Sequence, residues 1–117
     1  GGIIAWYSNH FPIETIETIT VDSLKSKLDN DEDIFLIDVR SPTELKDGYI
    51  KQAKNIYVGE IEDKIKNIPK NKPIVTVCGN GARASMAASI LKKYGFESMN
   101  VLGSMKAWYS ANYRIIK

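Results

Sequence analysis

The sequence of 117 residues has very little of the residue types that build disulfides, metal sites and histidine-based active sites. It contains a single cysteine, Cys78, and a single histidine, His10. One cysteine excludes a disulfide within the chain and a cysteine-rich metal site, so we expect no bound metal. His10 lies far along the chain from Cys78, which gives little support to a Cys-His protease site; we interpret His10 as a surface residue.

Long apolar runs and clustered charges are also missing. No apolar run approaches the length that spans a bilayer, and the first residues lack the basic start and long apolar stretch of a signal peptide. The net charge is only +2, with Lys and Asp/Glu interspersed, which is not typical of nucleic-acid binding. Hydrophobic residues make up 44%, as in an ordinary globular domain. We therefore expect a cytoplasmic domain with neither a membrane nor a nucleic-acid partner.

Strand-like and helix-like segments alternate along the chain. Apolar or β-branched runs predict strands over 34–37, 53–58, 74–77 and 98–102. Capping residues and helical spacing predict helices over 21–29, 42–47, 61–68, 84–94 and 106–112. This alternation indicates an α/β domain with a mainly parallel sheet, whose functional sites lie at the carboxyl ends of strands. Asp38 and Cys78 both fall at such ends.

The two ends of the chain carry a short internal repeat. Residues 1–9 align with residues 103–111, and both segments contain Ala-Trp-Tyr-Ser after a leading glycine. We interpret residues 1–13 as the remnant of a preceding homologous domain or a linker, and residues 14–117 as the domain itself. The alternative is a complete protein in which residues 1–13 are an integral part of the fold.

The segment from Cys78 to Arg83, Cys-Gly-Asn-Gly-Ala-Arg, joins a predicted buried strand to a predicted helix. Its two glycines allow the backbone to curl so that successive N–H groups point at the cysteine sulfur. The helix N-terminus and Arg83 add positive charge, so a thiolate would exist at neutral pH without a histidine base. The alternative is that Cys78 is a buried structural residue.

Several separated motifs lie along the chain, at 37–44, 48–50, 53–56, 78–85, 94–96, 101–103 and Trp108. Together they resemble the motifs of the rhodanese family, and the resemblance covers residues 15–113. The resemblance implies a three-layer α/β fold with a mainly parallel five-stranded sheet and helices on both faces. It also implies a sulfurtransferase that moves sulfane sulfur from thiosulfate or a persulfide, through a Cys78 persulfide, to a thiol or cyanide. No cofactor is expected beyond that covalent persulfide.

The same resemblance gives each matching residue a role. Cys78 becomes the nucleophile, and Arg83 binds the anionic part of the donor. The substrate-binding residues are Gly79, Asn80, Gly81, Ala82, Arg83 and Ala84. The supporting residues, expected to form ion pairs near the loop, are Asp38, Arg40 and Glu44; a capped helix with a solvated charged face is the alternative. Three positions depart from the family pattern: Tyr49, Gln52 and Ser104.

Loop length separates the remaining alternatives. Phosphatases of the same fold use a longer C-x-x-x-x-x-R loop, whereas four residues separate Cys78 from Arg83 here. The order of preference is therefore a sulfurtransferase, a non-catalytic or sulfur-carrier module, and a phosphatase or arsenate reductase. Rhodanese-like domains also occur in tandem and behind metallo-β-lactamase-fold hydrolases of the glyoxalase II kind. We expect the chain to be the last domain of such a longer protein, with upstream domains of the same polypeptide as partners.

Overall fold

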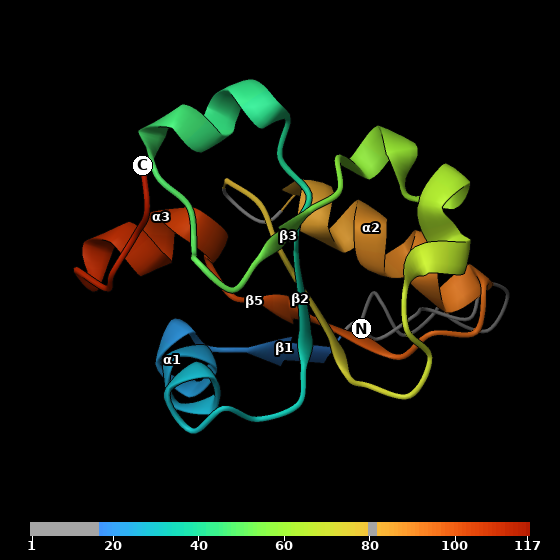
Figure 1. The fold of residues 1–117 in the computed structure, drawn as a ribbon, viewed down its shortest axis with the longest axis horizontal. Coiled ribbons are helices and arrows are strands. Elements are labelled where there is room, and N and C mark those ends of the chain that lie inside the picture. Colours follow the sequence, from blue (N-terminus) through green and yellow to red (C-terminus); the bar gives the residue numbers. More distant parts are fainter. Residues whose placement is uncertain (1–16, 80–81) are drawn as a thin grey trace, which may run out of the picture.

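In a computed structural model that describes residues 17–79 and 82–117, five short strands form one parallel sheet in the order β1-β5-β4-β2-β3 (Figure 1). The strands are β1 (Glu17–Ile19), β2 (Phe35–Asp38), β3 (Lys54–Asn55), β4 (Ile74–Val77) and β5 (Ser98–Val101). The central strand β4 is buried along its whole length, as its sequence Ile-Val-Thr-Val predicts for a strand covered on both faces. Its last residue, Val77, pairs with Asp38 of β2.

Helices cover both faces of this sheet, so the domain has three layers (Figure 1). The helical segments are α1 (Val21–Asp29), η2 (Pro42–Asp47), η3 (Val58–Glu60), η4 (Glu62–Asn67), α2 (Ala82–Lys93) and α3 (Ser104–Ser110). On one face, α1 and α3 pack Leu24 and Trp108 against Val75 of β4. On the other face, α2, η3 and η4 pack around Ile37 and Ile74. The α/β three-layer architecture with a parallel five-stranded sheet is confirmed.

The predicted strands agree with the observed ones to within one residue at each end, except in two places. The strand expected over 53–58 shortens to two residues, because the chain turns into η3 at Val58. The edge strand β1 carries no apolar run in the sequence, since it has only three residues and two of them are exposed. Parallel pairing with Met99–Val101 of β5 makes it a strand.

Two predicted helix starts, after Thr20 and Ser41, are confirmed, whereas α2 and α3 each begin two residues before the predicted start. The hydroxyl of Thr20 accepts a hydrogen bond from the N–H of Ser23 at 3.0 Å, which caps α1. At Ser41, the backbone N–H donates to the carboxylate of Glu44 at 3.0 Å, the reciprocal half of a capping box. The segments that follow Ser41 and Ile61 are 3₁₀ helices rather than α-helices. The predicted domain remnant at residues 1–13 lies outside the described residues.

Candidate active site

Cys78 lies directly after the last residue of the central strand β4 and four residues before the start of α2. It is completely buried and packs with Val39, Val58 and Ala84 on the α2 face of the sheet. In Figure 1 the yellow strand β4 runs toward the end of the sheet at which α2 begins. The most interior strand of the fold therefore delivers the only thiol of the chain to the carboxyl edge of the sheet.

The first turn of α3 holds the backbone on either side of this cysteine. The N–H of Met105 donates to the carbonyl of Cys78 at 2.8 Å, and the N–H of Lys106 donates to the carbonyl of Gly79 at 3.0 Å. The N–H of Cys78 donates to the hydroxyl of Ser104 at 3.1 Å. The first two bonds satisfy N–H groups that a helix start leaves without intrahelical partners, and the three together fix both peptide groups of Cys78.

Arg83, in the first turn of α2, forms a two-pronged ion pair with Glu44 of η2. Its Nη2 donates to Oε2 of Glu44 at 2.8 Å and its Nη1 donates to Oε1. The hydrogen bond from Arg83 is the main reason that the pKa of Glu44 falls from 4.5 to about 2. The same bond raises the pKa of Arg83, and the nearby Cys78 and Tyr57 add to that rise. Both side chains remain about one-third exposed, so the pair borders on solvent.

Asp38 and Arg40 form a second ion pair, which is almost completely buried. The Nη2 of Arg40 donates to Oδ2 of Asp38 at 2.8 Å, and both side chains are less than 5% exposed. Burial alone would lower the pKa of Arg40, but hydrogen bonds to Asp38 and its negative charge outweigh this effect and raise it. Arg40 also donates to the carbonyl of Gly48 and to the hydroxyl of Tyr109. This pair thereby ties the end of β2 to the end of η2 and to α3.

The predicted site residues thus divide into two sets. Cys78, Gly79 and Arg83 come together, since a β-carbon on Gly79 would lie 3.3 Å from Nη2 of Arg83. Of the supporting residues, Glu44 forms an ion pair with Arg83, which follows the loop, whereas Asp38 and Arg40 form an ion pair with each other. Asn80 and Gly81 lie outside the described residues, as does the side chain of Ala82. The sequence did not reveal the pairing of Glu44 with Arg83, which lie 39 positions apart.

Ser104 is the residue whose contribution the sequence indicated least clearly. Its only signal in the sequence was its departure from the family pattern. The structure places its side chain completely buried, with its hydroxyl between Cys78 and Val101. Tyr109 was likewise not foreseen, because its contact with Arg40 joins positions 69 apart in the chain.

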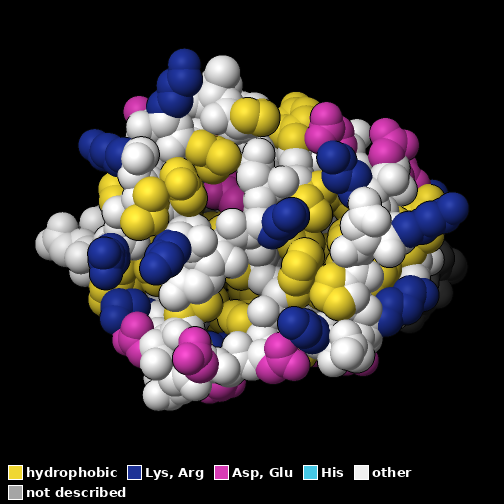
Figure 2. Space-filling model, viewed as in Figure 1, with side chains coloured by type: hydrophobic (Ala, Val, Ile, Leu, Met, Phe, Trp, Pro, Cys, Tyr) yellow, Lys and Arg dark blue, Asp and Glu magenta, His cyan; other side chains and the backbone are white. Residues whose placement is uncertain are grey.

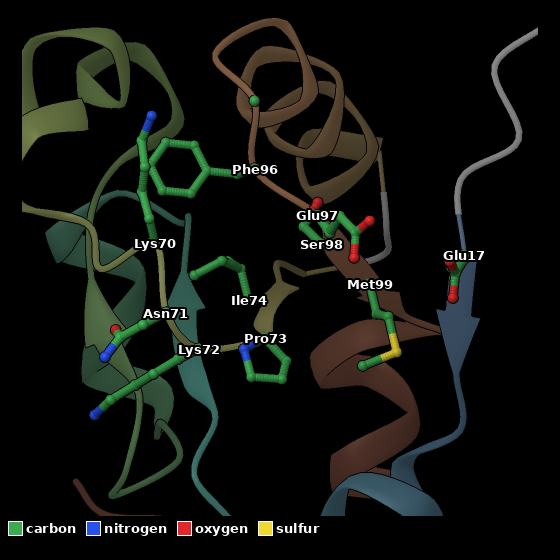
Figure 3. A pocket seen from close by; sticks show the side chains of 11 residues that line it. Glu17, Lys70, Asn71, Lys72, Pro73, Ile74, Phe96, Glu97, Ser98 and Met99 are labelled. Carbon is green, nitrogen blue, oxygen red and sulfur yellow. The ribbon is translucent and has the colours of Figure 1, made fainter.

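A separate cavity of about 460 Å³ lies at the opposite edge of the sheet. It is lined by the amino ends of β1, β4 and β5 and by the segments before them, among them Lys70, Pro73 and Phe96 (Figure 3). The ammonium of Lys70 lies 5.3 Å from the centre of the Phe96 ring. Four strand residues, roughly 13 Å, separate this edge from Cys78. Of the predicted site residues that the structure describes, none lines the cavity, so we place the candidate active site at Cys78.

The molecular surface carries both signs of charge. On the face viewed in Figure 1, the space-filling view shows Lys and Arg side chains interspersed with Asp and Glu (Figure 2). Within residues 17–79 and 82–117, no cluster of three or more His, Cys, Asp or Glu side chains has the arrangement of a metal site. None of the helices in this described part is long and apolar enough to cross a membrane.

A family model and two relatives of known name match most of this chain. The family model of the rhodanese-like domain matches residues 20–111. The chain is 39% identical over 93 residues to the putative sulfurtransferase YtwF of Bacillus subtilis, covering 80% of this chain and 90% of that protein. It is 34% identical over 95 residues to the putative sulfur carrier protein YrkF of the same organism, covering 80% of this chain but only 51% of the relative.

A solved structure supports the same fold. The crystal structure of reduced Bacillus anthracis CoADR-RHD superposes with a TM-score of 0.81 and 33% identity. The match covers 87% of this chain and 18% of that one, so a domain of this fold forms a small part of that longer chain. Together the matches support a general role in sulfur transfer.

Proposed function

The chain belongs to the rhodanese-like domain family, and from this premise we propose that Cys78 carries a sulfane sulfur, as a persulfide, from a small donor to a thiol acceptor. The observation that carries the proposal is the place of Cys78 between the central strand and the N-terminus of α2, with Arg83 in the first turn of that helix. Relatives named sulfurtransferase and sulfur carrier give it further support.

The proposed reaction consists of two displacements at sulfur. With thiosulfate, the Cys78 thiolate attacks the outer sulfur, the S–S bond of the donor breaks, and sulfite leaves with the bonding electron pair. The product is a Cys78 persulfide anion. An acceptor thiolate, or cyanide in an assay, then attacks the terminal sulfur and leaves Cys78 as a thiolate. Charge balances in both steps, and the sulfur atom needs neither an external oxidant nor a reductant.

The residues around Cys78 suit a negatively charged sulfur. A helix N-terminus favours an anion through its unpaired N–H groups and its dipole. The helix α2, which begins four residues after Cys78, has twelve residues. Arg83, in the first turn of α2, adds a full positive charge next to this end of the helix. Complete burial of Cys78 keeps bulk water away from the sulfur and strengthens these electrostatic interactions.

Glu44 limits how much of the charge of Arg83 is available to a donor. Because both ends of the guanidinium fork donate to its carboxylate, a dianion such as thiosulfate must compete with Glu44 for Arg83. The reacting group of a persulfide donor carries only one negative charge, so this group meets less repulsion from the carboxylate. We therefore propose that this site favours persulfide donors over thiosulfate, relative to the same site without Glu44.

The test is sulfur loading followed by intact mass. The protein is incubated with thiosulfate or glutathione persulfide and weighed without reductant. One sulfur atom should add, and none should add to Cys78→Ser. That variant is the cleanest control available, because it removes the only thiol while changing one atom. If neither donor adds sulfur to the wild type, the proposed function is wrong.

A sulfur carrier that loads but turns over slowly is the second candidate. The complete burial of Cys78 and the resemblance to a putative sulfur carrier protein favour it. Both candidates predict loading, but only the transferase predicts steady thiocyanate formation from thiosulfate and cyanide. Aryl phosphate hydrolysis, measured in parallel, should be negligible. Hydrolysis faster than sulfur transfer would favour the phosphatase alternative instead.

The setting of the domain in the cell extends the proposal. We propose a cytoplasmic domain that works as one unit of a longer polypeptide, with an upstream rhodanese-like or metallo-β-lactamase-fold domain as its partner. The repeat of Ala-Trp-Tyr-Ser motivates it. The small share of the longer solved chain that this domain matches agrees with such an arrangement. Reading the codons upstream of Gly1 tests it directly.

A further inference from the structure

Ser104 stands in a backbone conformation that its side chain does not favour. Its φ is +48°, in the left-handed region that residues with a β-carbon rarely adopt. The preceding residue is Gly103, also left-handed at φ +74°, where a β-carbon would lie 2.7 Å from that of Ala107. A glycine would fit position 104 with less strain as well. The hydroxyl is the group that serine has at this position and glycine lacks.

Its hydroxyl supplies a bridge between two strands at the point where both end. The hydroxyl donates to the carbonyl of Val101, the last residue of β5, at 3.2 Å. It accepts from the N–H of Cys78, the first residue after β4, at 3.1 Å. The β4–β5 pairing is thereby extended by one side chain, up to the cysteine itself. Both Cys78 and Val101 are buried, so no bulk water replaces the hydroxyl if it is lost.

We propose that Ser104 is a positioning residue, whose hydroxyl holds the Cys78 amide and thereby aims the sulfur of Cys78 at the incoming donor. Two bonds from α3 hold the carbonyls of Cys78 and Gly79, so the Ser104 hydroxyl completes the fixation of Cys78 from its amide side. This inference rests on the proposed function, because it assigns a role in the sulfur-transfer step. The role is one of orientation, exerted through the backbone N–H of Cys78.

Two substitutions separate this role from a contribution to folding. Ser104→Ala removes the hydroxyl and keeps a β-carbon at φ +48°, whereas Ser104→Gly removes the hydroxyl and relieves the strain. Ser104→Gly should therefore melt at a higher temperature than Ser104→Ala. Ser110→Ala is the matched control, since Ser110 is an exposed serine at the other end of the same helix.

The decisive measurement is single-turnover sulfur loading over a range of thiosulfate concentrations. In both Ser104 variants the maximal loading rate should fall about three- to tenfold, the scale of one lost hydrogen bond. The half-saturating thiosulfate concentration should stay as in the wild type, because Ser104 does not bind the donor. Ser110→Ala should load as the wild type does. A wild-type rate in Ser104→Gly, or losses that follow the melting temperatures, would overturn the proposal.

Alkylation of Cys78 by iodoacetamide keeps the inference testable if the proposed function fails. A wild-type protein that takes up no sulfur would contradict the proposed function alone. The alkylation rate constant then decides on Ser104. An equal fall in Ser104→Gly and Ser104→Ala supports the positioning role, and unchanged alkylation in Ser104→Gly refutes it.

Discussion

Two ion pairs lie within the same part of the molecule, and they differ in almost every physical respect. Asp38 and Arg40 are two residues apart in sequence and nearly inaccessible to solvent. Glu44 and Arg83 come from segments 39 residues apart and are each about one-third exposed. Every hydrogen bond described for the Arg40 guanidinium goes to protein groups that hold the fold together. The guanidinium of Arg83 is held by one carboxylate, beside the cysteine.

The difference separates stability from reactivity. A buried pair is difficult to break, because removal of one partner leaves a charge without compensation in a medium of low dielectric. An exposed pair contributes little to stability, since water and salt screen it. The same exposure lets a donor exchange with the carboxylate of Glu44. We therefore expect the Asp38–Arg40 pair to govern unfolding and the Glu44–Arg83 pair to govern sulfur loading.

Breaking the buried pair should have the largest effect on the fold. Arg40→Ala leaves Asp38 buried without its partner and should lower the free energy of unfolding by about 3–5 kcal/mol. Urea denaturation followed by far-UV circular dichroism measures this change. Arg114→Ala, at an exposed arginine, is the control and should change it by less than about 0.5 kcal/mol. Similar losses in the two variants would show that Arg40 contributes no more than an ordinary surface charge.

Removing Arg83 from the exposed pair should have the opposite effect, with a small loss of stability and a large loss of sulfur loading. Arg83→Ala should keep most of the stability but slow sulfur loading from thiosulfate about tenfold to a hundredfold, the scale of a lost hydrogen bond to a charged group. Part of that loss comes from Glu44, whose carboxylate then repels the donor. The double variant Arg83→Ala/Glu44→Gln should therefore load faster than Arg83→Ala alone. No recovery in the double variant would contradict the role assigned to Glu44.

The smallest effect is expected from Glu44→Gln alone, and it depends on pH. Because the folded-state pKa of Glu44 is about 2 rather than 4.5, ionised Glu44 stabilises the fold above about pH 4.5. This contribution is lost as the pH falls towards 2. Screening at this exposed site limits it to at most about 1 kcal/mol. Denaturation of wild type and variant between pH 7 and pH 2.5 should give curves that converge on acidification. Curves that stay parallel would mean that another group carries the pH dependence.

Local signals in the sequence were sufficient for much of the fold. The run Ile74–Val77 predicted the central strand with its observed bounds, and Thr20 and Ser41 predicted two helix starts. These are interactions within a few residues, so the sequence records them directly. The 3₁₀ form of η2 was not predictable in this way. Its six residues end at Asp47, and the carbonyl of the following Gly48 accepts bonds from both Arg40 and Tyr109.

The candidate site was predictable as a segment but not as an arrangement. The glycines and Arg83 marked the loop after Cys78, because their chemistry is local. The partner of Arg83 depends on how β2 and β4 lie side by side, which no short pattern encodes. Ser104 illustrates the same limit, since its hydroxyl binds a residue 26 positions away. The predicted roles of Asn80, Gly81 and Ala82 stay predictions.

The hydrogen bonds from α3 to the carbonyls of Cys78 and Gly79 have a consequence for protein synthesis. The chain emerges from the ribosome in order, so β4 and its cysteine appear before β5 and α3 do. Parallel pairing of β4 with β5 and the bonds from Met105 and Lys106 require the last part of the domain. A nascent chain that stalls before Lys106 therefore exposes the thiol of Cys78 before the bonds from Met105 and Lys106 can form. The site around Cys78 is therefore completed only when nearly the whole domain has been translated and folded. Sulfur loading at a correctly oriented Cys78 cannot begin before that point.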